Sequence, residues 1–541
     1  MLGNLLEKVL KEDENDYVSG AKDEIASKKD EIPEKKSKRI NIKSLWLPIL
    51  IFLIALTPRL YFLFSHDTQN IGYDWYGDVY HHWQIAYLTK TVGLSHGFLR
   101  LWDLKGMEYF WGLLQPLVLV IIFTITNSSN IVILRLLSIF CSSIVIALVF
   151  LIVKREFNAS AAWASALFLI FMPVILFSDT LGMQEPLSLM LLLLGVYLWP
   201  KHPVITGFCW AFAAMNRADY WLFSIGLFIA AVLERRKVGE RNPKPALILS
   251  WIIPIVLYMK YLASYTGNYI YPIYWNFLAS VVGDWFEKRL NPYFPHLFLD
   301  QTKIIMFALF VVGIISALWV IIKKYKSYLF YLTGIFNLIL VGFMFSVAAY
   351  TWGYIDRFWV DRLFAWPYGF IGIMASIFFL YYLPRKLKIW RILRLGWIVM
   401  LLLLLATQIS WKMINNYWDF AKRPWEATVE MAKVTADGWN KQGNILLPEN
   451  QPHYIYALVQ FNGIKGKQII GEMYDPFYYI TGKETTEEMD IKFIDWLKEN
   501  NITYIVVNSV HDTQYTPIFQ RHPDIFKYIN AIYSVKLYEF L

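Results

Sequence analysis

Apolar runs, many of them about 17–25 residues long, recur along the chain up to residue 413. A helix of about 20 residues matches the hydrocarbon thickness of a bilayer, and lipid offers the backbone no hydrogen-bond partner, so such runs are typical of membrane-spanning helices. The composition agrees, because 57% of the residues are hydrophobic, whereas globular chains are about half apolar. The sequence therefore predicts an α-helical polytopic membrane protein. Its candidate spans are 44–64, 131–153, 159–178, 186–200, 203–215, 220–233, 246–264, 303–322, 328–349, 365–383 and 396–413.

One further apolar run, 111–125, decides the orientation of the chain because it is short for a full crossing. If it does not cross, five basic loops lie on the same side as the basic cluster at 35–43, which fits the preference of Lys and Arg for the cytoplasmic face. We therefore expect 111–125 to form an interfacial or half-inserted helix. About eleven spans remain, in a cell membrane, with the N-terminus in the cytoplasm. The five basic loops are 154–157, 200–202, 234–244, 323–326 and 384–394.

Composition divides the chain into three parts. Residues 1–43 mix Lys with Asp and Glu, which predicts a charged cytoplasmic tail. Residues 44–413 form the predicted transmembrane domain, with outer loops at 65–130 and 265–302. Residues 414–541 predict a small extracytoplasmic α/β domain. Its strand-like runs are NILLP, KQIIG, ITYIVVNS and YSVKLYEF, and its helical pattern is TTEEMDIKFIDWLKEN, with Asn500–Asn501 as the expected stop.

Several function classes lack their sequence signals. The net charge is +9, but the basic loops beside the spans account for it as an orientation signal, so we expect no nucleic-acid partner. The chain has no Gly-rich phosphate loop, no HExxH motif and no GxSxG motif. Cys141 and Cys209 both lie in apolar runs, which excludes an external disulfide framework.

The first predicted outer loop contains the acidic and imidazole side chains of GYDWYGDVYHHWQIAY, residues 72–87. Asp78 and His82 are four apart and share one face of a helix. Asp78 is a candidate general base toward an acceptor hydroxyl, although an acid at a helix start can also simply cap it. Asp74, His81 and His82 are candidate substrate-binding residues, and polar caps at an interface are the alternative for the histidines.

The second predicted outer loop, SDTLGMQEPLSL, carries Asp179 and Glu185. Together with Asp78, these carboxylates could hold a divalent cation such as Mg²⁺ or Mn²⁺ through oxygen ligands. Glu185 could instead cap the following span. The spacing does not separate these interpretations.

Arginines follow in two further outer segments, with Arg217 in MNRADYW and Arg357 and Arg362 in YIDRFWVDRLFAW. An arginine at a membrane surface can hold a lipid-linked phosphate through paired N–H groups. Each of the three also lies close in sequence to an aspartate, so ion pairing is the alternative.

The order of these parts resembles the GT-C superfamily of polytopic glycosyltransferases. The resemblance implies transfer of a sugar from a polyprenyl-phosphate donor to a lipid, glycan or protein acceptor at the outer face of the bilayer. The family often has Glu directly after the first-loop Asp, whereas this chain has Val79. The residues that carry the resemblance are, in chain order, Asp78, Ile85, Ala86, Glu185 before Pro186, and Arg217 after AFAAMN.

The resemblance also implies roles for these residues in an inverting hexosyl or pentosyl transfer. Asp78 would accept the acceptor's proton, Arg217 or Arg357 would stabilise the departing lipid phosphate, and Asp179 and Glu185 would position the acceptor or hold a divalent ion. Oligosaccharyltransferases share this topology, but WWDYG is absent after residue 414, which favours transfer of a single sugar. A non-catalytic lipid-linked glycan transporter and a receptor or assembly scaffold stay open as alternatives.

Overall fold

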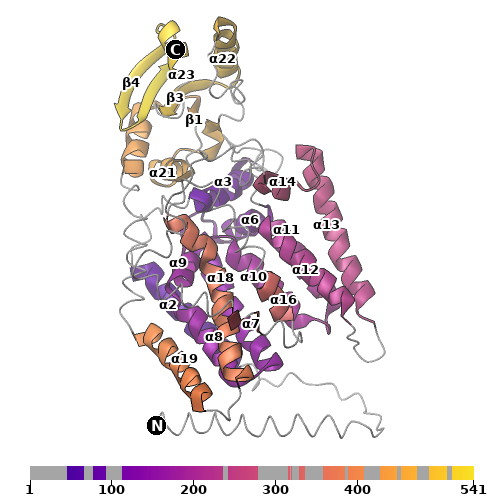
Figure 1. The fold of residues 1–541 in the computed structure, drawn as a ribbon. Coiled ribbons are helices and arrows are strands. Elements are labelled where there is room, and N and C mark those ends of the chain that lie inside the picture. Colours follow the sequence, from indigo (N-terminus) through magenta and orange to yellow (C-terminus); the bar gives the residue numbers. More distant parts are fainter. Residues whose placement is uncertain are drawn as a thin grey trace.

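The computed structural model describes residues 46–65, 77–92, 112–234, 242–277, 315–316, 318–319, 328–335, 357–383, 388–406, 427–447, 452–471, 486–508 and 515–541. Helices dominate these residues, and a small sheet lies at one end of the helical body (Figure 1). The main helices of the body are α2 (Trp46–Ser65), α3 (Gly77–Val92), α6 (Leu114–Thr126), α7 (Val132–Glu156), α8 (Ala159–Phe171), α9 (Pro173–Leu181), α10 (Glu185–Leu198), α11 (Pro203–Asn216), α12 (Asp219–Leu233), α13 (Lys244–Thr266), α14 (Tyr271–Phe277), α16 (Tyr328–Ile335), α18 (Arg357–Ile377), the π-helix η7 (Phe378–Tyr382) and α19 (Lys388–Ala406).

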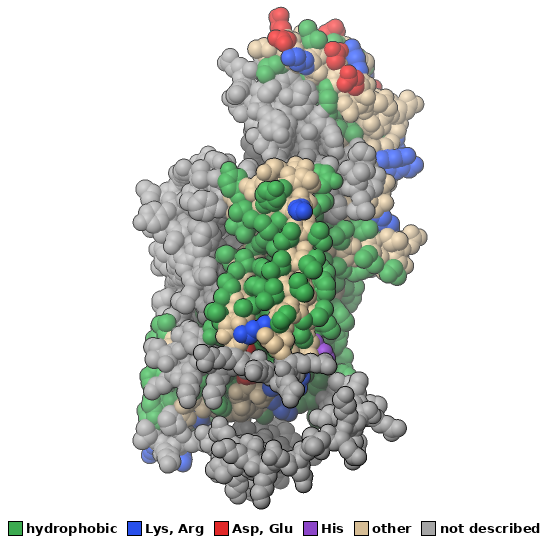
Figure 2. Space-filling view, turned by 90° about the vertical axis from the view of Figure 1, so that its right-hand side faces the viewer, with side chains coloured by type: hydrophobic (Ala, Val, Ile, Leu, Met, Phe, Trp, Pro, Cys, Tyr) green, Lys and Arg blue, Asp and Glu red, His purple; other side chains and the backbone are tan. Residues whose placement is uncertain are grey.

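Several of these helices have the length and apolar character of membrane spans. Four qualify in the described part of the chain: α2, α7, α13 and the segment Ala365–Tyr382. Figure 2 shows apolar side chains covering the face on which α13 lies, as expected for a surface in contact with lipid. The chain is thus largely helical with several membrane-length apolar helices, and the predicted number of eleven spans stays a prediction.

The predicted span 159–178 is two helices rather than one. α8 ends at Phe171 and α9 begins at Pro173, and the pair is bent by 61°. Proline lacks a backbone N–H and has a fixed φ, so it starts a helix more readily than it continues one. The pair counts as a fifth candidate span if both helices belong to one crossing.

Small residues let α18 approach α8 closely. A Cβ on Gly372 would lie 2.2 Å from Cδ1 of Phe168, and one on Gly369 would lie 2.8 Å from Leu169. Since apolar lipid supplies no hydrophobic drive for helices to associate, close van der Waals contact of this kind is the main attraction between them.

The predicted interfacial helix 111–125 corresponds to α6, which has 13 residues. Its length agrees with the expectation that it is too short to cross a bilayer. Its position at the membrane surface, and the orientation of the chain that depends on it, stay predictions.

The sheet contains all four predicted strands and one that was not predicted. The strand order is β2-β1-β3-β5-β4, with β2, β1 and β3 parallel and β5 antiparallel to both β3 and β4. The unpredicted strand is β4, an edge strand with a largely exposed surface. The strands are β1 (Asn444–Leu447), β2 (Ile469–Gly471), β3 (Ile502–Asn508), β4 (Phe526–Ile532) and β5 (Val535–Phe540).

Short helices accompany the sheet, among them α21 (Pro452–Asn462), the 3₁₀ turn η8 (Gly466–Gln468), α22 (Glu487–Glu499) and α23 (Tyr515–Arg521). Thr486 caps α22 by accepting a hydrogen bond from the Met489 N–H, as its TTEE start predicts. α22 ends at Glu499, directly before the predicted stop at Asn500–Asn501. Asn501 has φ +50°, a conformation that asparagine tolerates. The boundaries of the proposed domains stay predictions.

Candidate functional site

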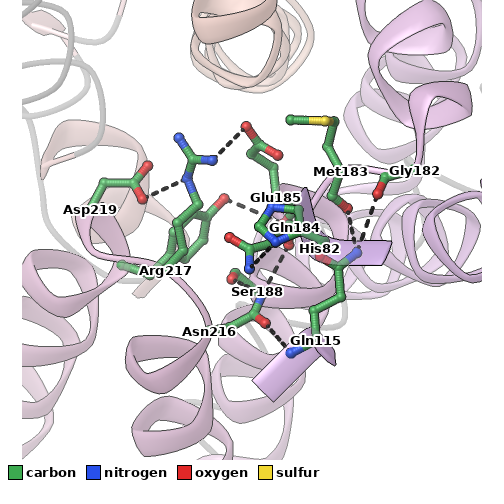
Figure 3. Close-up of polar contacts among 11 residues, drawn as sticks. His82, Gln115, Gly182, Met183, Gln184, Glu185, Ser188, Asn216, Arg217 and Asp219 are labelled. Atoms are coloured by element: carbon green, nitrogen blue, oxygen red, sulfur yellow. Dashed lines mark hydrogen bonds and ion pairs between the residues drawn. The ribbon is translucent and has the colours of Figure 1, made fainter. Parts of the chain in front are cut away.

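The ends of several helices bring polar side chains together at one place (Figure 3). They are the start of α6, the turn between α9 and α10, the turn between α11 and α12, and one face of α3. All four lie in segments that the sequence predicts to be on the outer side. The side chains that meet there include His82, Gln115, Gln184, Glu185, Asn216, Arg217 and Asp219.

Asn216, the last residue of α11, connects three of these segments. Its Oδ1 accepts a hydrogen bond from the backbone N–H of Gln115 at 2.8 Å. Its Nδ2 donates to the carbonyl of Gln184 at 3.1 Å and to Oγ of Ser188 at 2.8 Å. Asn216 is fully buried, so these bonds replace the water that its amide loses on burial. They fix the start of α6 and the start of α10 to the end of α11.

Arg217 lies between two carboxylates. Its Nη1 is 3.0 Å from Oε1 of Glu185, and its Nε is 2.8 Å from Oδ1 of Asp219. The three side chains stay partly exposed, at 17%, 11% and 23% respectively for Arg217, Glu185 and Asp219. The ion pair with Asp219 that the sequence left open is therefore present, and Glu185 is a second partner that the sequence did not indicate.

His82 connects α3 to the turn that precedes Glu185. The Nδ1 atom of His82 lies 3.3 Å from Nε2 of Gln184, the residue next to Glu185 in the chain. Both His82 and its neighbour His81 are buried. The predicted helix is confirmed as α3, and it places His82 against the α9–α10 turn.

Two glycines allow the close approach of these segments. Gly112 has φ +87°, and a Cβ there would lie 2.5 Å from the backbone oxygen of Asn216. Gly182 has φ +96° and lies against the backbone of Arg135. The Gln115 side chain completes the junction by donating from Nε2 to the carbonyls of Gly182 and Met183, both at 3.3 Å.

Asp179 belongs to a separate ion pair. Its Oδ2 is 2.7 Å from Nη2 of Arg59, and both side chains are fully buried between α2 and α9. Arg59 also donates from Nη1 to the Ala55 carbonyl at 2.9 Å and from Nη2 to the Leu169 carbonyl at 3.3 Å. Asp179 is thus paired with Arg59 and is not a member of the Arg217 triad. A common carboxylate group, as predicted, would require Asp179 and Glu185 to lie together without separate cation partners.

The sequence reading missed two buried arginines, Arg59 and Arg135. Arg135 lies in the first turn of α7, is fully buried, and borders the α9–α10 turn at Gly182. A cation inside or beside an apolar run is costly in a membrane protein and usually marks a functional or ion-paired position. That signal was present for both residues in the sequence.

Four of the predicted site residues lie wholly or partly outside the described part. Asp74 is outside the described residues, and Asp78 lies in α3 with an undescribed side chain. Arg357 and Arg362 lie in α18, also with undescribed side chains. Their proposed roles stay predictions.

The described acids do not fit a divalent-cation site as they stand. Asp179 is engaged by Arg59 and Glu185 by Arg217. Among residues whose side chains are described, no group of three or more His, Cys, Asp or Glu is arranged to hold a metal ion. The set Asp78, Asp179 and Glu185 therefore stays a prediction, and we derive no reaction step through a metal.

Comparison with known proteins gives one family match. Residues 112–259 match the family described as dolichyl-phosphate-mannose-protein mannosyltransferase. A comparison with curated proteins found no match. The matched segment begins at Gly112 and runs through the α9–α10 turn and the Arg217 triad.

Solved structures with a similar arrangement share little sequence with the chain. An oligosaccharyltransferase from Archaeoglobus fulgidus, tethered to an acceptor peptide, has 13% identity and a TM-score of 0.48 over 88% of this chain and 72% of that one. ArnT from Cupriavidus metallidurans, bound to undecaprenyl phosphate, has 12% identity and a TM-score of 0.47 over 92% and 98%. The arabinofuranosyltransferase AftD from Mycobacteria has 13% identity and a TM-score of 0.48 over 90% and 40%.

The family match supports the resemblance of this chain to the GT-C superfamily of membrane glycosyltransferases.

Proposed function

We propose that the protein is a membrane glycosyltransferase that transfers a sugar from a polyprenyl-phosphate-linked donor to an acceptor at the outer membrane face. The observation that carries the proposal is Arg217, held between Glu185 and Asp219 at helix ends inside the family-matched segment. A guanidinium with several N–H donors suits a phosphate, and the adjacent carboxylates suit hydroxyl groups of an acceptor or sugar.

The reaction breaks the bond between the sugar's anomeric carbon and the phosphate oxygen and forms a bond from that carbon to an acceptor oxygen. The electron pair of the broken bond leaves with the lipid phosphate, where Arg217 stabilises the charge that develops. The acceptor's proton passes to Asp78, the candidate general base on α3. Attack from the face opposite the leaving phosphate inverts the anomeric configuration.

Glu185 orients Arg217 in this scheme. It holds the Nη1 end of the guanidinium while Asp219 holds Nε, so the plane of the group is fixed before the donor arrives. A group oriented in advance needs little reorganisation as the reaction proceeds, which is the basis of electrostatic catalysis.

The finer parts of the proposal concern topology and substrates. We propose eleven spans, a cytoplasmic N-terminus and an extracytoplasmic domain at 414–541, which together put the Arg217 triad at the outer face. The transferred group is a single hexosyl or pentosyl unit, and the acceptor is a lipid, a glycan or a protein.

The test is a transfer assay on the purified full-length protein in lipid nanodiscs, with radiolabelled polyprenyl-phosphate sugars as donors. We expect transfer by the wild type, and at least a hundredfold lower turnover for Asp78→Asn and Arg217→Ala. Asp524→Asn, at an exposed acid near β4, is the matched control and should retain turnover. Donor binding without any transfer by the wild type would contradict the proposal and favour a transporter. Unchanged turnover in Asp78→Asn would remove that residue from the base role.

A further inference from the structure

The helix α3 is contacted by a segment from near the other end of the chain. α21 and η8 both pack on it, as Figure 1 shows for α21. α3 carries Asp78, His81 and His82, so the contact concerns the helix that holds the first-loop site candidates. The contact joins residues more than three hundred positions apart in the sequence.

Tyr456 of α21 lies at the centre of this contact. Its Oη accepts a hydrogen bond at 3.2 Å from the backbone N–H of Ile131, just before α7. Its ring makes edge contacts with Tyr80 and Trp83 of α3, with ring centroids 5.3 and 4.9 Å apart. Burial raises the pKa of Tyr456, and the Ile131 hydrogen bond and the Arg135 charge act in the opposite direction. Tyr456 therefore touches α3 with its ring and the start of α7 with its hydroxyl.

Further hydrogen bonds surround Tyr456. Trp83 donates from Nε1 to the Ser129 carbonyl at 2.6 Å, and Gln460 donates from Nε2 to Ser129 Oγ at 3.0 Å. On the other side, the Gly466 backbone N–H donates to Oη of Tyr87 at 3.2 Å. A Cβ at Gly466 would lie 2.5 Å from the Tyr87 ring, so this contact requires glycine.

A second contact of α3, through His82, leads to the turn beside the Arg217 triad. Trp83 and His82 are adjacent in α3, and His82 contacts Gln184 beside Glu185. A shift of α3 that separates Trp83 from Tyr456 would therefore also disturb the contact between His82 and Gln184. Displacing a catalytic group by about 1 Å can lower turnover roughly a hundredfold.

We propose that Tyr456 is a positioning residue, which holds α3, the helix that carries Asp78, against the start of α7 and so keeps His82 in contact with Gln184 beside the Arg217 triad. The inference rests on the proposed function, because it assigns Tyr456 a part in the same transfer reaction. With this role for Tyr456, the segment after residue 414 helps to organise the site rather than to bind a separate ligand.

The experiment uses the full-length protein in nanodiscs and compares Tyr456→Ala, Tyr456→Phe and Tyr528→Ala. Tyr528 is an exposed tyrosine on β4 and serves as the matched control. Hydrogen–deuterium exchange of the peptide covering 77–92 reports the order of α3 without reference to activity. Transfer assays give kcat and the KM for the polyprenyl-phosphate sugar.

We expect Tyr456→Ala to speed exchange in 77–92 and to lower kcat at least tenfold, with the KM for the donor changed less than threefold. Tyr456→Phe keeps the ring contacts with α3 but loses the hydrogen bond from Ile131, so its exchange and its kcat should lie between those of Tyr456→Ala and the wild type, and Tyr528→Ala should match the wild type. Gly466→Ala, which disturbs the same contact from η8, should reproduce the faster exchange if Tyr456→Ala does not fold.

Two results would overturn the inference. One is unchanged exchange in 77–92 for both Tyr456→Ala and Gly466→Ala, which would show that α21 and η8 do not hold α3. The other is faster exchange with unchanged kcat, which would show that the order of α3 does not govern turnover. A wild type that binds the donor but never transfers sugar overturns the proposed function instead, and the exchange data still decide whether α3 is held.

Discussion

The guanidinium of Arg59 lies 2.7 Å from the carboxylate of Asp179, with both side chains fully buried. The pair connects α2 to the end of α9, which leads directly into the turn that carries Gln184 and Glu185. Two charges taken out of water repay their desolvation only when the geometry is good and further hydrogen bonds are made. Arg59 meets this condition through the Ala55 and Leu169 carbonyls.

Removing one partner of this pair should cost more stability than removing both. Arg59→Met leaves the Asp179 carboxylate buried and uncompensated, and we expect a loss of about 3–5 kcal/mol in the free energy of unfolding. The double variant Arg59→Met/Asp179→Leu replaces both charges with apolar groups and should lose less. Thermal unfolding in nanodiscs measures both. A double variant less stable than either single variant would contradict the argument.

Exchanging Arg217 for lysine should impair catalysis while leaving the fold intact. A lysine ammonium is a single point charge without the forked donors that reach Glu185 and Asp219 at once. We expect turnover to fall at least tenfold, measured in the transfer assay. Arg155→Lys, at the opposite end of α7 from Arg135 and partly exposed, is the matched control and should keep normal turnover. Equal turnover of Arg217→Lys and wild type would show that the fork geometry is unimportant.

Two glycines with positive φ should respond differently to alanine. Gly112 and Gly267 have φ +87° and +73°, so alanine is strained at both, by about 1–2 kcal/mol. Only Gly112 faces a backbone atom at 2.5 Å, whereas nothing lies within 4 Å of a Cβ at Gly267. We therefore expect Gly112→Ala to lower the melting temperature clearly more than Gly267→Ala. Equal shifts would mean that α6 does not need to approach α11 this closely.

The ion pairs of Asp490 predict a pH dependence outside the membrane. Arg521 approaches its two oxygens at 2.6 and 2.7 Å, and His522 at 3.1 Å. Hydrogen bonds from Arg521 hold the pKa of the Asp490 carboxyl below its usual value, although burial opposes them. Since the folded-state pKa is the lower one, the stabilisation is fully present above the unfolded pKa of about 4 and is lost as the pH falls through the folded value.

Asp490→Asn should therefore destabilise the contact between α22 and α23 most at neutral pH. Pulse proteolysis of the intact protein at about pH 7 and about pH 3 measures this difference. We expect the difference in free energy of unfolding between wild type and Asp490→Asn to be smaller at the lower pH. Lys492→Met, on an exposed part of α22, is the control. A stability difference that is constant or grows as the pH falls would show that the ionised Asp490 carboxylate does not stabilise this contact.

The strands and helices with clear periodicity could be predicted from the sequence. β1, β2, β3 and β5 and the helix α22 lie where β-branched runs and a capped amphipathic pattern indicate them. β4 was missed because an edge strand buries little, and FKYINAI lacks a regular apolar alternation. The bend between α8 and α9 was missed because the apolar run continues through Pro173.

The segments that carry the candidate site residues could be picked out from the sequence, but the pairing of their side chains could not. Glu185, Arg217 and His82 lie near one another at helix ends, in segments that the sequence predicts to be outer loops. Asp179 pairs with Arg59, and Arg217 pairs with Glu185. These pairs depend on how the helices pack, and the local spacing of residues carries no information about helix packing. Asn216 was missed because an asparagine at a helix end is common and gives no signal of its own.

The bond between the Gln115 backbone N–H and Asn216 connects positions 101 residues apart. A ribosome adds about 5–20 residues per second, so roughly 5–20 s pass between the synthesis of α6 and that of the asparagine that anchors it. During this interval the nascent α6, a helix of 13 residues, cannot yet make this bond. The junction between α6 and α11 therefore forms only after α11 has been synthesised.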